Sequence, residues 1–146
     1  MKLGVIFHPK FPPEILADYA RRAEAAGLAA MRIMESPGLF ENWHVRVTSF
    51  LDSLQASLDE IGFPARIQSL GCSFYIYIGT REPVNEYKDF ANLDPALAKA
   101  FYSKCVEKGV YFHTDFTVSE RHDEATLGKA AEIILSAARE AKEELL

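Results

Sequence analysis

Apolar residues recur every three or four positions in three stretches of the chain, the spacing of one helical face. The first stretch covers about residues 42–61 and is closed by Gly62, and the second covers about 95–108 and is closed by Gly109. The third follows Asp123, a residue type suited to a helix N-cap. The pattern therefore predicts three amphipathic helices.

Strand-like runs lie between and before these helices. The segment 65–79, "ARIQSLGCSFYIYIG", is interrupted at Gly71 and predicts two adjoining strands or one bent strand. The short runs "VYF" (110–112) and "FTVS" (116–119) predict two further strands. A polar loop, "TREPVNEYKDFANLD", separates the first of these runs from the second helix.

The first 38 residues follow a different pattern. "KLGVIF" (2–7) reads as a strand, "PPEILADYARRAEAAG" (12–27) as a helix, and "AAMRIM" (29–34) as a second strand. Together they predict a right-handed βαβ unit. We expect an α+β, or mixed α/β, fold in which about four helices pack on a small mixed sheet to which this unit adds strands.

Composition narrows the functional classes. A chain of 146 residues with 49% hydrophobic content can bury one core, so we expect a single compact domain. The formal charge is −5 and Arg21–Arg22 is the only adjacent basic pair, which argues against nucleic acid. The apolar start is too short for a leader or a membrane span, and Cys72 and Cys105 lack CxxC spacing. We expect a cytoplasmic protein with reduced thiols and no membrane partner.

Residues 40–146 resemble the C-terminal small domain of class III, pyridoxal-phosphate-dependent aminotransferases, in particular the glutamate-1-semialdehyde aminomutase branch. The resemblance rests on "LDEIGFPARIQSLGCSFYIYIG", on the polar loop, and on "CVEKGVYFHTDFTVSERHDEATLGKAAEIILSAAREA". The chain departs from the family in "VSERH", where an apolar-rich ending is usual, and in a shorter loop after "GVYFH". These departures from the family pattern argue against a substrate contact by this loop.

The resemblance also implies which chemistry is missing. Enzymes of this family need a Schiff-base lysine, an acidic partner for the pyridine nitrogen and a phosphate-binding cup, all of which belong to their large domain. This chain is too short to contain that domain, and "IGTRE" does not sit at a phosphate-binding turn. We therefore assign no catalytic residue and expect no cofactor on the chain alone.

Residues 1–38 resemble, more generically, the first βαβ unit of luciferase-like flavin monooxygenases, which are TIM barrels. One such unit cannot form the barrel mouth where a flavin would bind. The two resemblances meet near Gly38 and Phe40 without a linker, as in a natural fusion or a chimera.

Two residues are candidate substrate contacts. Arg81 follows the strand pair, where small domains of related aminotransferases lend a basic side chain to a substrate carboxylate, and His113 lies in "GVYFHTDF". A surface arginine is the competing interpretation of Arg81. His113, Asp115 and His122 could converge, but their spacing fits no metal-ligand pattern, so we expect no metal.

The preferred hypothesis is a non-catalytic binding or interaction module descended from an aminotransferase small domain. The main alternative is one half of a split pyridoxal-phosphate enzyme whose large domain is separately encoded. A flavin-associated protein is a third alternative. Because a small sheet has exposed edges, and dimerisation commonly hides such edges, we also expect a homo-oligomer.

Overall fold

The computed structural model describes residues 21–22, 25, 36–111 and 116–146. The chain divides into two compact units, Met1–Asn42 and Trp43–Leu146, and the following description concerns almost entirely the second. The elements are α2 (Leu39–Glu60), β1 (Ala65–Leu70), β2 (Ser73–Ile78), the 3₁₀ helix η1 (Tyr87–Asn92), α3 (Pro95–Glu107), β3 (Phe116–Thr117) and α4 (Glu124–Leu145). Of the predicted βαβ unit only residues 21–22 and 25 are described, and they are helical, as the predicted helix 12–27 requires. Both predicted strands of the unit lie outside the described residues, and the prediction of a single domain stays a prediction.

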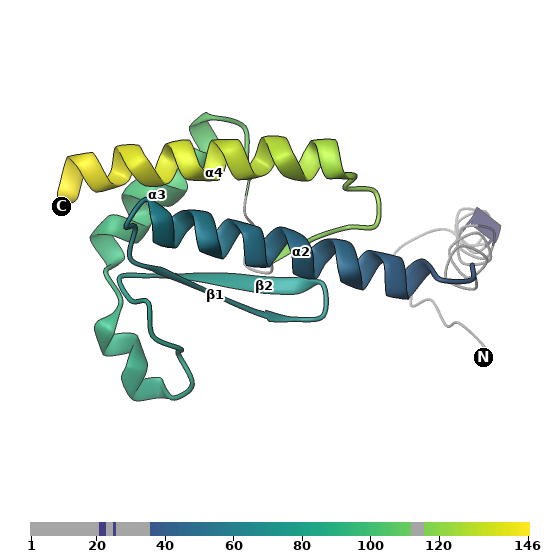
Figure 1. Ribbon diagram of the computed structural model, residues 1–146, viewed down its shortest axis with the longest axis horizontal. Helices are drawn as coiled ribbons and strands as arrows, with labels where there is room; N and C mark the ends of the chain where they lie inside the picture. The colour runs from purple at the N-terminus through teal and green to yellow at the C-terminus, as the bar shows by residue number, and fades with distance from the viewer. Residues whose placement is uncertain (1–20, 23–24, 26–35, 112–115) are drawn as a thin grey trace, which may run out of the picture. The chain divides into compact units, whose positions relative to one another are not determined.

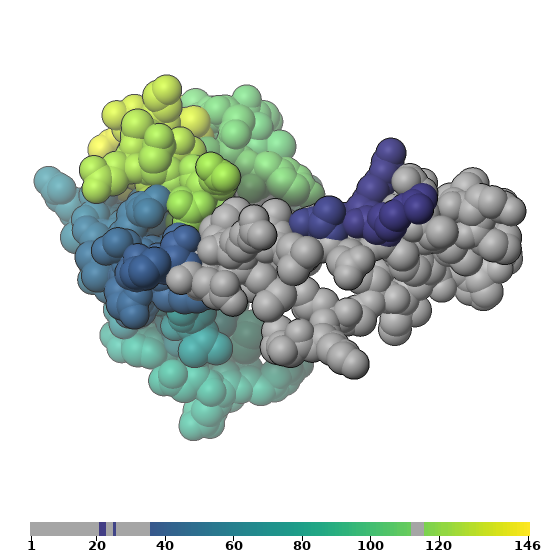
Figure 2. Space-filling model, turned by 90° about the vertical axis from the view of Figure 1, so that its right-hand side faces the viewer, coloured from purple at the N-terminus to yellow at the C-terminus, as the bar shows by residue number. Residues whose placement is uncertain are grey.

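The three strands form an antiparallel sheet in the order β1-β2-β3. The segment 65–79 is therefore two strands, joined by the two-residue turn Gly71–Cys72. Figure 1 shows α2 running along the sheet and α4 lying beyond α2. The same layers are seen from the side in Figure 2, with α4 in yellow-green, α2 in blue and the sheet in teal. The predicted α+β fold is confirmed.

One face of the sheet carries the core. Ile76 and Ile78 of β2 are buried against apolar residues of all three helices. Phe63, between α2 and β1, packs on Phe101 of α3 with ring centroids 5.4 Å apart. The fully buried large side chains are Phe63, Phe101, Leu54, Leu58, Ile76, Leu97, Ile134, Val47 and Cys105. Burying such side chains is the main stabilising contribution to this unit.

Helix ends follow the sequence signals closely. The Asp94 carboxylate accepts hydrogen bonds from the N–H groups of Ala96 and Leu97, and Asp123 accepts one from Thr126.

No helix of the described residues is both long and apolar enough to cross a membrane.

The strand predicted at 110–112 is not formed at its described residues. The N–H of Val110 donates to the Cys105 carbonyl at 2.9 Å, and the N–H of Gly109 donates to the Val106 carbonyl at 3.0 Å. This pair of bonds is the Schellman closure of α3. Val110 therefore belongs to the end of a helix, which the apolar run alone did not reveal.

Candidate functional site

The second face of the sheet has a different character from the core face. Its side chains come from Arg66, Gln68 and Leu70 of β1 and from their cross-strand partners on β2, Tyr77, Tyr75 and Ser73. We call this surface the outer face. Because strand side chains alternate between faces, these residues point away from the buried Ile76 and Ile78.

The loop between β2 and α3 covers one half of the outer face. The N–H of Val84 donates to Gln68 Oε1 at 2.7 Å, and Val84 itself is buried. Phe90 of η1 meets the Tyr77 ring edge-on, with centroids 6.0 Å apart. The segment predicted as a plain polar loop is thus a cover that contains a 3₁₀ helix.

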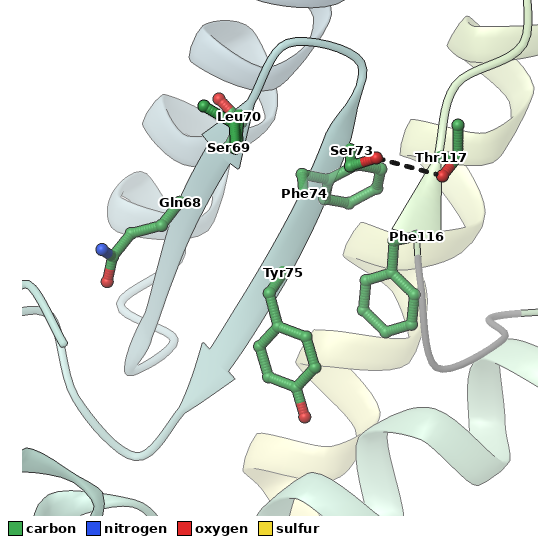
Figure 3. A pocket seen from close by; sticks show the side chains of 8 residues that line it. All are labelled: Gln68, Ser69, Leu70, Ser73, Phe74, Tyr75, Phe116 and Thr117. Carbon is green, nitrogen blue, oxygen red and sulfur yellow. Dashed lines mark hydrogen bonds between the residues drawn. The ribbon is translucent and has the colours of Figure 1, made fainter. Parts of the chain in front are cut away.

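The other half of the outer face is open. Leu70 is 89% exposed and Tyr75 is 42% exposed. A hollow of about 530 Å³ lies at this end of the sheet. Figure 3 shows the side chains that line it: Gln68, Ser69, Leu70, Ser73, Phe74, Tyr75, Phe116 and Thr117. The Ser73 and Thr117 hydroxyls lie 3.4 Å apart across β2 and β3, and the Tyr75 and Phe116 rings stack with centroids 5.4 Å apart.

The chemistry of this open half suits contact with another surface. Among the described residues, its lining offers apolar surface, hydroxyls and one amide, and no carboxylate, lysine or histidine. A hydroxyl acts as a nucleophile when a neighbouring base activates it, and the described lining supplies no carboxylate, lysine or histidine for that role. A large exposed leucine beside aromatic rings is instead typical of a surface that binds a protein.

The segment around His122 is built as a turn that leads into α4. The N–H of Ser119 donates to His122 Nδ1 at 3.1 Å, and the Arg46 guanidinium donates to the carbonyls of Glu120 and His122 at 3.1 and 3.0 Å. The Trp43 indole N–H donates to the Val118 carbonyl at 2.9 Å. Among the described residues this part of "VSERH" serves to fasten the chain to α2.

The candidates His113 and Asp115 lie outside the described residues, so the contact proposed for His113 stays a prediction. The described part of the chain contains no group of three potential metal ligands.

Arg81 lies near the C-terminal end of α2. A Cβ placed on Gly62 would stand 3.6 Å from the Arg81 guanidinium and 3.0 Å from the Lys142 ammonium. Lys142 donates to the Ile61 carbonyl at 2.9 Å, so both cations stand at the negative end of the α2 dipole. Arg81 does not line the open half of the outer face. Its predicted contact with a substrate carboxylate stays a prediction.

The pKa shifts of Cys105, Lys104 and Asp89 have ordinary structural causes. The pKa of the Cys105 thiol is raised by burial, and the pKa of Lys104 is raised by its hydrogen bond to Glu144. Two backbone N–H donors, from Asn85 and Glu86, lower the pKa of Asp89. None of these shifts is of the kind that prepares a lysine or cysteine to act as a nucleophile.

Aminomutases and a transaminase are among the known proteins similar to this chain. The chain is 30% identical over 89 residues to the glutamate-1-semialdehyde 2,1-aminomutase of Desulfitobacterium hafniense strain Y51, and the match covers 61% of this chain and 20% of that protein. It is 25% identical over 118 residues to the aminomutase of Protochlamydia amoebophila, covering 78% of this chain and 27% of that protein. An omega-transaminase from Sphaerobacter thermophilus shares the fold, with a TM-score of 0.65 at 17% identity over 80% of this chain and 27% of that one.

The resemblance to the aminotransferases is confirmed. The matches are consistent with a class III aminotransferase-like small domain, and the chain spans only about a fifth to a quarter of the length of these relatives. No protein-family model matches the chain. The resemblance of residues 1–38 to luciferase-like monooxygenases finds no support in these relatives.

Sequence reasoning missed the open half of the outer face. A signal was present, because Leu70 shares its strand face with the polar residues Arg66 and Gln68. A large apolar residue on a polar strand face becomes informative where it adjoins an exposed aromatic side chain, as Leu70 and Tyr75 do in the lining of the hollow.

Proposed function

We propose that the chain acts as a non-catalytic binding module of the aminotransferase small-domain type, and that the open half of the outer face is its binding surface. The observation that carries this proposal is the division of the outer face. The loop that holds Val84 and Phe90 covers one half, whereas Leu70 and Tyr75 remain exposed on the other. An exposed apolar patch on a sheet is a favourable place for a partner to bind, because binding removes the patch from water.

The partners of three described lysines, Lys104, Lys108 and Lys142, support a non-catalytic role. Lys104 and Lys108 of the α3 segment make 2.8 Å ion pairs with Glu144 and Glu140 of α4. Lys142 is held by the Ile61 carbonyl. A lysine that forms a Schiff base needs a neutral amine, and a carboxylate neighbour favours the charged ammonium instead. None of these lysines lines the open half of the outer face.

The test is a pyridoxal-phosphate titration of the full chain, followed by borohydride trapping and mass mapping of modified lysines. We expect scattered labelling that rises with cofactor concentration and does not saturate. Trapping of a single lysine at one equivalent of cofactor would show that the chain carries its own Schiff-base residue, and the non-catalytic proposal would fail.

The second candidate is one half of a split aminotransferase-type enzyme, and the length comparison favours it specifically. The matched part covers only 20% of the D. hafniense aminomutase and 27% of the P. amoebophila aminomutase, so most of each relative lies beyond it. In this alternative a separately encoded large domain would cover Leu70 and Tyr75 and supply the lysine, and Arg81 would be free to meet a substrate carboxylate.

A reconstitution experiment separates the two candidates. The D. hafniense aminomutase is produced without its matched stretch of 89 residues and mixed with this chain, and aminomutase activity is measured. The binding-module proposal expects no activity above that of the truncated enzyme. The split-enzyme alternative expects activity in the mixture, which Leu70→Asp abolishes and Val106→Asp, a change at a half-exposed valine of α3, preserves.

A further inference from the structure

Strand β1 forms one edge of the sheet, and α2 closes only the first part of that edge. The Gln55 side-chain amide donates to the Ala65 carbonyl at 3.1 Å, and Gln55 Oε1 accepts from the Ile67 N–H at 2.7 Å. One side chain thus satisfies two backbone groups in the way that a neighbouring strand would. These two bonds also show which backbone groups of β1 point away from β2.

Within the described part of the chain, the remainder of the β1 edge has backbone groups without a hydrogen-bond partner. Successive residues of an antiparallel strand direct their N–H and C=O groups to alternate edges of the strand. The N–H and C=O of Ser69 therefore point away from β2, as those of Ile67 do. No side chain or loop among the described residues bonds to Ser69 N–H, Ser69 C=O or Ile67 C=O. The Gly71 N–H points the same way, because the Leu70 carbonyl on the same trans peptide faces Ser73.

This free edge also lacks the features with which proteins prevent strand pairing. Residues 67–73, "IQSLGCS", contain no charge and no proline, and Ser69 and Leu70 are exposed. Natural edges usually carry lysine, proline or an inward-pointing charge. The chain bears a net charge of −5, so two copies repel in general, but this stretch brings no like charges together.

We propose that a second copy of the chain binds this edge, with the two β1 strands antiparallel about a two-fold axis through Ser69. Ser69 of each copy then donates to and accepts from Ser69 of the other. The Gly71 N–H of each copy donates to the Ile67 carbonyl of the other, so four hydrogen bonds cross the axis and leave the Gln55 bonds intact. The three-stranded sheets join into one sheet of six strands.

The register favours a second copy over an unrelated strand because the free groups are self-complementary. In this register Gln68 faces Leu70 of the other copy at a non-hydrogen-bonded position, where side chains approach closely. The exposed leucine therefore covers the stem of a glutamine, and Arg66 faces Cys72, an uncharged residue. The dimer also places two open outer faces side by side. The proposed dimer does not depend on the proposed function of the chain.

The test uses the full chain and two substitutions at one position. Ser69→Pro removes the N–H that crosses the axis but no ladder bond to β2, whereas Ser69→Ala keeps both backbone groups. Sedimentation velocity at micromolar concentration should show twice the 16.4 kDa chain mass for the wild type and Ser69→Ala. For Ser69→Pro we expect the dimer dissociation constant to rise roughly tenfold or more, since two interchain bonds are lost. A monomeric wild type, or an unchanged Ser69→Pro dimer, would overturn the proposal.

A cross-linking measurement decides the matter if Ser69→Pro does not fold. In a Cys72→Ser background, Ser69→Cys should form a covalent dimer on mild oxidation, because Cα atoms of facing residues in a hydrogen-bonded pair stand about 5.5 Å apart. Ser103→Cys, at an exposed serine of α3, is the matched control and should stay monomeric on a non-reducing gel. Equal cross-linking of the two variants, or none at Ser69→Cys, would exclude this register.

Discussion

The backbone N–H of Ile67 donates to the side-chain oxygen of Gln55 at 2.7 Å, across twelve positions of sequence. The Gln55 amide nitrogen returns a bond to the Ala65 carbonyl at 3.1 Å. A residue of α2 therefore completes part of the hydrogen-bonding of edge strand β1. This places a helix, rather than water or another strand, on the first half of the edge and leaves Ser69 to form its bonds elsewhere.

Removing this side chain should destabilise the sheet edge. We expect Gln55→Ala to lower the free energy of unfolding by about 1–3 kcal/mol, because it leaves the Ile67 N–H and the Ala65 carbonyl without partners in a partly buried place. Gln55→Glu should lose less, since a carboxylate still accepts from Ile67. Urea unfolding followed by circular dichroism measures both. Equal stability of Gln55→Ala and the wild type would show that water replaces the amide.

Local sequence signals predicted the helices well. Hydrophobic spacing placed α2, α3 and α4 to within a few residues, and Asp123 was correctly predicted as the N-cap of the last helix. These signals work because a helix face, a cap and a terminal glycine are properties of neighbouring residues. The break at Gly71 likewise indicated the hairpin between β1 and β2.

The tertiary contacts that shape the outer face and the β1 edge could not be predicted from such local signals. The 3₁₀ helix Tyr87–Asn92 has no hydrophobic period, so its role as cover for Tyr77 through Phe90 depends on tertiary contact alone. The same holds for the pairing of Gln55 with β1. Arg81 could be named from a resemblance, but its place near Gly62 follows from how the loop folds over the end of α2.

Gly79 should be the least replaceable glycine among those with a described environment. Its φ is 108°, and an added Cβ would overlap the Asp94 backbone nitrogen and stand 2.8 Å from the Leu93 carbonyl carbon. Because a side chain is strained at this φ and backbone cannot easily retreat, Gly79→Ala should cost about 2–4 kcal/mol of stability. Thermal and urea unfolding of the purified variant measure the loss.

Gly128→Ala is the control for this substitution. Gly128 lies in α4, is exposed, and has no atom within 4 Å of the position that its Cβ would take. Alanine is favoured over glycine inside a helix, so this change should raise stability by about 0.5–1 kcal/mol. A loss for Gly79→Ala no greater than the effect of Gly128→Ala would contradict the close approach of the loop to β2.

Tyr102 should stabilise the edge of β2 that faces β3. Its hydroxyl donates to the Ile76 carbonyl at 2.8 Å, beyond the point where the two-residue strand β3 ends. Burial raises the pKa of this phenol, so it stays protonated and remains a donor. Tyr102→Phe should cost about 1–3 kcal/mol, because the Ile76 carbonyl loses its donor. Tyr87→Phe, at a residue that is 93% exposed, should change the urea midpoint little.

The two cysteines should differ sharply in reactivity. Cys105 is fully buried in α3, and burial raises the pKa of its thiol to about 12. Cys72 lies in the hairpin turn and is only partly buried. With a disulfide reagent at pH 8, we expect the native chain to react quickly at one thiol, and Cys72→Ser to remove that fast reaction. Fast labelling that survives in Cys72→Ser would mean that Cys105 is accessible.

Cys105 should also make stability depend on alkaline pH. Its folded pKa lies above the usual value near 9, so the neutral thiol is favoured in the folded state. The contribution to stability is therefore complete below about pH 9 and is lost as the pH rises toward 12, because the unfolded chain ionises first. Cys105→Ala should lower stability at pH 7 by leaving a small cavity, yet show a shallower decline between pH 9 and 11 than the wild type. Parallel declines in urea unfolding of the two proteins would show that other groups, such as Tyr102, account for the alkaline loss.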